Sequence, residues 1–192
     1  MARYCQALAA VGLAAGAALS AAPAAAQTTR TPDPNAPRLM VGTFRAADTK
    51  SGVQVGDAVR DRLTRDLNVK QMWVIPKQDI TATLDASGFP TDQPLAPHDA
   101  RALAQQLRAD MYVVGNVIRD STGQGYRVDA QYVLARDNSL VQPLPSVRVG
   151  NPKDAAGPIA KAFKDAHAQF AAERDCYRAA REQKYPDARA AR

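Results

Sequence analysis

The clearest helical pattern early in the chain lies at residues 53–67. Apolar residues recur there every four positions, at Val55, Val59, Leu63 and Leu67. Charged residues fill the intervening positions, among them Asp57, Arg60 and Asp61. This spacing places the apolar side chains on one face, so we expect an amphipathic helix whose second face is solvated and carries mixed charge.

A second amphipathic helix is predicted from Pro97 to Leu107. Proline suits the first turn of a helix because its missing N–H would have no partner there, and Asp99 adds negative charge near the same end. The apolar residues follow at helical spacing, at Ala100, Leu103, Ala104 and Leu107. The preceding residues 77–96 are ambiguous: Asp79 is a candidate cap for a short helix, and glycine and prolines then interrupt regular structure.

Five runs have the composition of β-strands. They occupy residues 39–44, 69–75, 111–118, 126–135 and 140–149. The first two flank the first helix, which favours a parallel pair with a right-handed crossover. The fourth alternates between apolar and polar residues, which indicates an antiparallel strand with one wet face. Pro143 and Pro145 confine the fifth to an edge or a loop.

Residues 155–192 have a different composition, rich in alanine and charged residues. An apolar stripe at helical spacing comprises Ile159, Ala162, Phe163, Ala166 and Phe170. The stripe predicts a long helix from about Gly157 to Gln183, and Pro186 suits the start of a short final helix. We therefore expect an α/β fold, bordering on α+β: a mixed sheet of about four to five strands, two amphipathic helices packed on it, and a C-terminal helical hairpin.

The first residues indicate export. Residues 1–26 combine Arg3, a short alanine-rich apolar run and Ala24-Ala25-Ala26, the pattern of a secretory signal peptide cleaved near Ala26. Residues 27–38 contain three prolines and predict a flexible leader. No later apolar run is long enough to span a bilayer, so we expect a soluble periplasmic or secreted protein with an α/β domain at 39–150 and a helical segment at 155–192.

The charge pattern argues against a nucleic-acid partner, and the cysteine content leaves one thiol in the mature chain. The chain holds 25 Lys and Arg against 19 Asp and Glu, a net charge of +6. The basic residues are interleaved with acids and lack an aromatic stacking platform, and a nucleic-acid role also conflicts with export. Cys5 lies in the predicted signal peptide, which leaves Cys176 either as a small helix residue or as a thiol that pairs between chains.

The sequence contains no recognisable catalytic motif. The phosphate-binding loop, the dinucleotide fingerprint, the zinc-protease helix and the nucleophile elbow are all absent. His98 stands beside Asp99 at a predicted helix start, where a solvated first-turn pair explains both residues. His98 and His167 are far apart and have no matching cysteines, which argues against a zinc site. We expect no catalytic residues, no cofactor and no metal.

Two segments resemble a known periplasmic module. Val74-Ile75-Pro76-Lys77-Gln78-Asp79 follows the second strand, and Leu107-Arg108-Ala109-Asp110-Met111-Tyr112-Val113-Val114-Gly115-Asn116-Val117 enters the third. Together with the order of elements, they are similar to the amino-terminal domain of TolB and to related modules of CsgG-type and FlgT-type envelope proteins. The resemblance covers roughly residues 39–149 and implies a β–α–β–α–β–β fold better than it implies a task.

The last residues suggest a second resemblance. Lys184-Tyr185-Pro186-Asp187-Ala188 looks like the turn between the two helices of a tetratricopeptide repeat. Only part of one repeat is present, and such repeats are stable only when several stack. The segment is therefore either the start of a repeat array or a capping helical hairpin.

Two classes of function follow. In the first, the protein is a non-catalytic interaction module of the cell envelope that binds a partner protein through a sheet edge or the helical extension. The candidate contact residues are Arg127, Asp129, Gln131 and Arg148. In the second, it is a small-ligand sensor or an enzyme whose site lies near residues 43–50 and 76–79, after the carboxyl ends of parallel strands. A polar-lined cleft there would favour the second class, and an open sheet edge the first.

Overall fold

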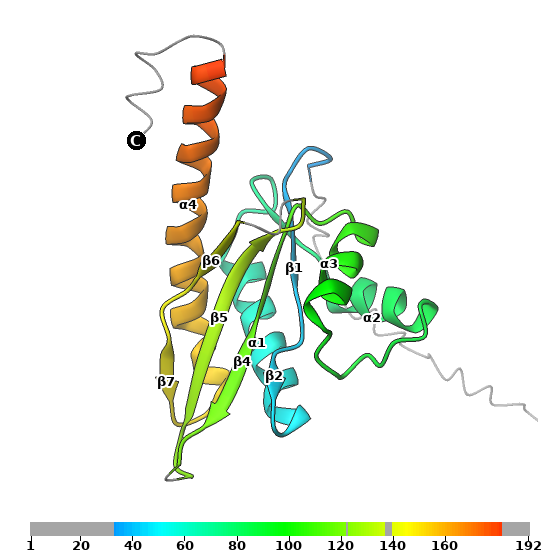
Figure 1. The fold of residues 1–192 in the computed structure, drawn as a ribbon, viewed down its shortest axis with the longest axis vertical. Coiled ribbons are helices and arrows are strands. Elements are labelled where there is room, and N and C mark those ends of the chain that lie inside the picture. The colour runs from blue at the N-terminus through cyan, green and yellow to red at the C-terminus, as the bar shows by residue number, and fades with distance from the viewer. Residues whose placement is uncertain (1–32, 122, 137–139, 182–192) are drawn as a thin grey trace, which may run out of the picture.

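The computed structural model describes residues 33–121, 123–136 and 140–181 (Figure 1). The elements in chain order are β1 (Arg38–Val41), β2 (Arg45–Ala46), α1 (Thr49–Asp66), β3 (Trp73–Val74), α2 (Lys77–Ala86), α3 (Pro97–Gln106), β4 (Met111–Arg119), β5 (Tyr126–Leu134), β6 (Val141–Pro143), β7 (Val147–Val149), the 3₁₀ helix η1 (Pro152–Ala155) and α4 (Ala156–Arg181). The predicted signal peptide, the first half of the leader and the short helix at Pro186 lie outside the described residues.

The strands form one mixed sheet in the order β3-β1-β4-β5-β6, with β2 beside β4 and β7 beside β5. β1 runs parallel to both β3 and β4, whereas β4 and β5 pair antiparallel from Met111 opposite Leu134 to Arg119 opposite Tyr126. The parallel pair of β1 with β3, the antiparallel strand at β5 and the α/β fold class predicted from the sequence are confirmed. The five predicted runs give seven strands, because the first run splits into β1 and β2 and the last into β6 and β7.

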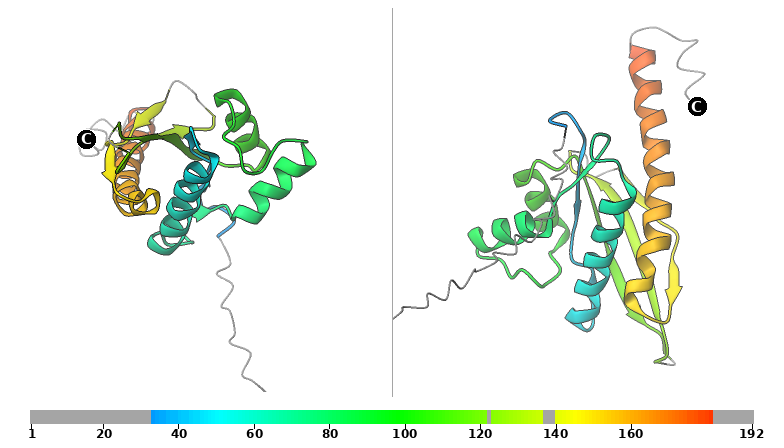
Figure 2. Two further views of the ribbon diagram at one scale, coloured as in Figure 1. Left: turned by 90° about the horizontal axis from the view of Figure 1, so that it is seen from below. Right: turned by 180° about the vertical axis from the view of Figure 1, so that it is seen from behind.

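One face of the sheet is covered by α1 and by the first turns of α4, which lie side by side (Figure 2). Fully buried side chains in this core include Phe44, Val59, Leu63, Tyr132, Ile159 and Phe163. The Tyr132 and Phe163 rings meet edge to face, with centroids 5.2 Å apart. The start of the predicted C-terminal stripe therefore belongs to the same core as the sheet.

The opposite face is covered in part by α2 and α3, whose apolar residues form a second cluster with the sheet. Its members include Met40, Ile75, Ile80, Leu103, Tyr112 and Val133. Successive residues of a strand point to opposite faces, so Leu39 and Val41 join the first cluster while Met40 joins the second. The two amphipathic helices predicted from the sequence thus pack on opposite faces of the sheet.

α1 begins at Thr49, before the predicted start at residue 53, because Asp48 caps it. The Asp48 carboxylate accepts a hydrogen bond from the backbone N–H of Ser51 at 3.1 Å and a second from the Ser51 hydroxyl. Such a cap satisfies a backbone donor that would otherwise have no partner in the first turn. Within the described ranges, no helix is long and apolar enough to cross a membrane.

Candidate functional site

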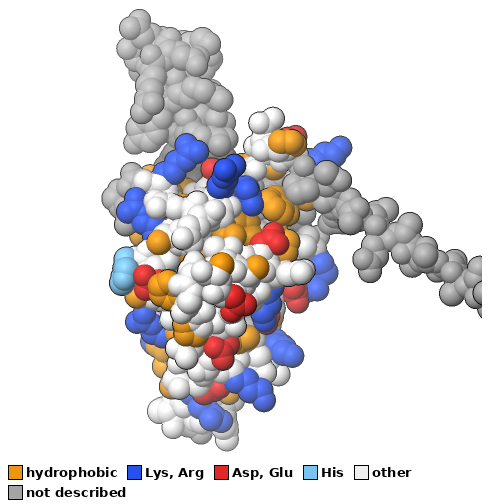
Figure 3. Space-filling view, turned by 90° about the vertical axis from the view of Figure 1, so that its right-hand side faces the viewer, with side chains coloured by type: hydrophobic (Ala, Val, Ile, Leu, Met, Phe, Trp, Pro, Cys, Tyr) orange, Lys and Arg blue, Asp and Glu red, His pale blue; other side chains and the backbone are white. Residues whose placement is uncertain are grey.

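A cleft with a volume of about 700 Å³ opens on the face of the sheet that carries α2 and α3. It exists because these two short helices and the loop that joins them cover only part of that face. The floor is apolar and includes Met40, Leu103, Tyr112, Val114 and Val133. Figure 3 looks onto this side of the molecule and shows hydrophobic side chains exposed between charged ones.

A charged cluster closes one end of the cleft, where α1 meets the start of α2. The Asp57 carboxylate lies 2.7 Å from Nη1 of Arg60 and 2.6 Å from Nζ of Lys77. Arg60 also donates from Nη2 to the backbone oxygen of Val41 at 2.6 Å. The sequence placed Arg60 on the solvated face of the helix, and this was wrong: Arg60 is only 6% exposed, because its long side chain reaches back to β1.

Both helices on this face begin at the cleft without a side-chain cap. Pro76 precedes α2 and Ala96 precedes α3, and neither supplies a hydrogen bond to the first turn. Residues of both first turns, Lys77 and His98 among them, line the cleft. The unpaired N–H groups of a helix start carry partial positive charge, which Asp79 and Asp99 in the same two first turns partly offset.

Tyr112 places a polar atom in the apolar floor. The residue is only 5% exposed, and its hydroxyl has no hydrogen-bond partner among the described residues. Burial raises the pKa of the Tyr112 hydroxyl above its ordinary value, although the positive charge of Arg101 acts in the opposite direction. The hydroxyl is therefore protonated at neutral pH and available as a hydrogen-bond donor.

The four residues predicted as partner contacts lie on two adjacent strands: Arg127, Asp129 and Gln131 on β5, and Arg148 on β7. Arg127, Asp129 and Gln131 alternate with buried residues of β5 and so point to the face of α2 and α3. Arg127 pairs with Asp129 at 3.2 Å, and the Ser146 hydroxyl donates to the same carboxylate. Arg148 lies opposite Arg127 in the pairing of β7 with β5, whereas Gln131 lines the cleft.

The region predicted for a small-ligand site also meets the cleft. Thr43, Arg45 and Lys77 belong to the two stretches singled out from the sequence, and all three line the cleft. Tyr112 and Val114 are floor residues that sequence reasoning assigned only to a buried strand. Tyr112 and Asn116, the two polar side chains inside an otherwise apolar run, were the signal of polar groups there.

The sheet edge offers less for strand addition than the sequence suggested. β6 and β7 form one edge and hold three residues each. Leu144 turns inward between them, and neither Pro143 nor Pro145 has an N–H to donate. β3 forms another edge with only two residues. The cleft is therefore the better candidate for binding.

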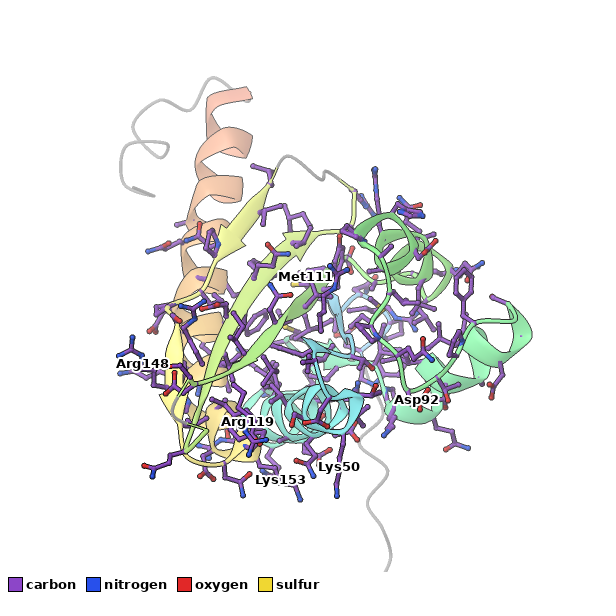
Figure 4. All side chains as sticks on the ribbon, turned by 60° about the horizontal axis from the view of Figure 1, so that its bottom comes forward. Lys50, Asp92, Met111, Arg119, Arg148 and Lys153 are labelled. Atoms are coloured by element: carbon purple, nitrogen blue, oxygen red, sulfur yellow. The ribbon has the colours of Figure 1, made fainter. Side chains whose placement is uncertain are left out.

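Among the described residues, no group of three or more His, Cys, Asp or Glu side chains is placed to hold a metal ion. His98 and Asp99 lie 3.2 Å apart at the start of α3, where the His98 side chain is 83% exposed. Figure 4 shows Asp92 beside α2 and Arg148 at the other edge of the sheet, on β7.

No family model matches the sequence, and no curated protein matches it. Among solved structures, the chain is similar to the LpoB C-terminal domain from Escherichia coli, with a TM-score of 0.43, 12% identity, and coverage of 58% of this chain and 79% of that one. TolB from Acinetobacter baumannii gives a TM-score of 0.43 and 15% identity over 72% of this chain and 29% of TolB.

A third similar structure is lipoprotein GNA1162 from Neisseria meningitidis, with a TM-score of 0.43, 17% identity, and coverage of 71% of this chain and 96% of that one. At these low TM-scores and identities, the likenesses say nothing of what this chain binds or does. TolB, whose amino-terminal domain the sequence resembles, is among these structures, and the resemblance to a tetratricopeptide repeat stays a prediction.

Proposed function

We propose that this protein is a non-catalytic binding module of the bacterial cell envelope, and that its cleft holds a segment of a partner protein. The observation that carries the proposal is the apolar floor of the cleft beneath a polar rim. Binding interfaces concentrate their affinity in such places, where an apolar anchor leaves water and the rim fixes its orientation. The signal peptide predicted at residues 1–26 supports a place in the envelope.

Exposed apolar side chains around the cleft support a macromolecular occupant. Val141 lines the cleft and is 40% exposed, and the adjacent Leu140 is 42% exposed. Ile118 is 44% exposed on the face of β4 that α2 and α3 leave open. A segment lying across the open half of the sheet would cover these side chains as well as the floor of the cleft.

Site-specific photocrosslinking in cells tests this proposal. We expect a photoreactive phenylalanine at Gln131, inside the cleft, to crosslink one envelope protein that the same residue at Arg148 does not capture. Both positions are exposed and lie on adjacent strands, so they differ mainly in access to the cleft. Crosslinking of the same proteins from both positions, or of none from Gln131, would show that the cleft does not hold a partner.

A small-molecule ligand is the second candidate. The cleft lies at the carboxyl ends of β1 and β3, where open α/β sheets usually bind ligands, and its volume suits a small molecule. A library of envelope metabolites should then contain a compound that raises the melting temperature of the wild-type protein. The bulky variant Gln131→Trp, which fills the cleft, should abolish that rise.

A further inference from the structure

The side chains that line the cleft carry more positive than negative charges. Asp57 already pairs with both Arg60 and Lys77, so these three groups leave one positive charge. Arg45 adds a second positive charge: it is exposed and forms no ion pair within the described part of the chain. Against them stands Asp92, on the loop between α2 and α3. The lining side chains therefore carry a net positive charge.

Hydrogen-bond donors from three elements border the same space. The uncapped first turns of α2 and α3 contribute backbone N–H groups, which favour a negative charge. The Tyr112 hydroxyl of β4 contributes another donor, since the residue lies at the floor of the cleft and the hydroxyl has no partner among the described residues. An incoming acceptor can therefore pair with it without displacing a protein partner.

We propose that the cleft selects an acidic peptide segment, in which an Asp or Glu side chain lies next to apolar residues. The carboxylate takes its place near Arg45 and Lys77, and the neighbouring apolar side chains cover Met40, Val114 and Val133. This proposal rests on the proposed function, because it names the chemistry of the segment that the cleft holds. Charge complementarity of this kind sets which partners a surface accepts.

The test begins with a phage-displayed library of random twelve-residue peptides, selected on the purified exported chain. We expect the recovered peptides to carry Asp or Glu beside apolar residues. The tightest peptide is then synthesised with a fluorophore and measured by fluorescence anisotropy. Exchanging its carboxylate for an amide, or introducing Arg45→Glu into the protein, should each weaken binding by about tenfold.

Two further variants separate the possible results. Lys153→Glu changes an exposed basic residue outside the cleft and should leave the affinity unchanged. Gln131→Trp fills the cleft and should abolish binding. If the selection yields no peptide whose binding Gln131→Trp abolishes, both the proposed function and this proposal are contradicted. A peptide that Gln131→Trp blocks, but that binds Arg45→Glu and the wild type equally, overturns the acidic preference alone.

Discussion

At the scale of single residues, a tight constraint lies at Gly115 in the middle of β4. A Cβ atom there would lie 2.2 Å from the backbone oxygen of Asp129 and 2.6 Å from the Phe44 ring. Phe44 is fully buried, and it packs directly over this glycine. Because Gly115 has no side chain, the Phe44 ring, which lies between β1 and β2, packs directly against the backbone of β4. The same lack of a side chain lets β4 lie close to β5.

Gly115→Ala should therefore lower the free energy of unfolding by about 2 kcal/mol, since both neighbours must move to admit a methyl group. Gly150→Ala is the matched control, because nothing lies within 4 Å of its added Cβ. Urea denaturation of both variants measures the difference. Equal stability of the two variants would show that the contact between Phe44 and Gly115 is not tight.

At the scale of the elements, the first turn of α1 ties stability to pH. The pKa of Asp48 lies below its ordinary value of 3.8, chiefly because the Ser51 hydroxyl and then the Ser51 N–H donate to its carboxylate. A carboxyl group with a lowered pKa in the folded state stabilises the fold above its ordinary pKa. That contribution is lost as the pH falls through the lowered value.

Asp48→Asn keeps the oxygen acceptor of the cap but cannot titrate. We expect its free energy of unfolding to fall less steeply than that of the wild type as the pH drops from 5 to about 2.5. Asp48→Ala, which lacks the cap altogether, should be less stable than both at pH 7. Chemical denaturation at a series of pH values measures these curves, and parallel curves for wild type and Asp48→Asn would contradict the assignment.

The sequence predicted these elements well where the signal is local. The four-residue period of Val55, Val59 and Leu63 defined the buried face of α1, and Pro97 marked the start of α3. It failed for Arg60, since a periodicity argument counts every charged residue as exposed. Whether a long side chain finds a carbonyl to bind depends on β1, which is distant in sequence.

At the scale of the whole molecule, the cleft could not be predicted in detail for the same reason. The two stretches that contain Thr43 and Lys77 were found, because carboxyl ends of parallel strands are a general location for sites. Tyr112 and Gln131 join them only through the pairing of β4 with β5 and through the limited cover that α2 and α3 provide. These are properties of the packed fold and leave no local pattern in the sequence.

The dependence of the fold on α4 is also a property of the whole molecule. Phe163 and Ile159 are fully buried against the sheet and α1, and Lys164 pairs with Asp66 at 3.4 Å. Phe163→Ala should lower the free energy of unfolding by about 3–5 kcal/mol. Lys161→Ala, an exposed change two residues earlier, should have almost no effect in the same denaturation experiment.

Removing residues 155–192 should abolish cooperative unfolding, because it deletes both buried side chains at once. Near-ultraviolet circular dichroism of the shortened chain measures whether its aromatic side chains keep a fixed packing. A native-like spectrum would show that the sheet with α1, α2 and α3 folds without α4.

α4 also continues well past the sheet that anchors it (Figure 1). Its last residue described as buried is Ala166, and the helix runs on to Arg181. At a rise of about 1.5 Å per residue, the stretch from Ala166 to Arg181 is roughly 22 Å long. The far end of α4 thus lies outside both layers of the core, away from α2 and α3 (Figure 1).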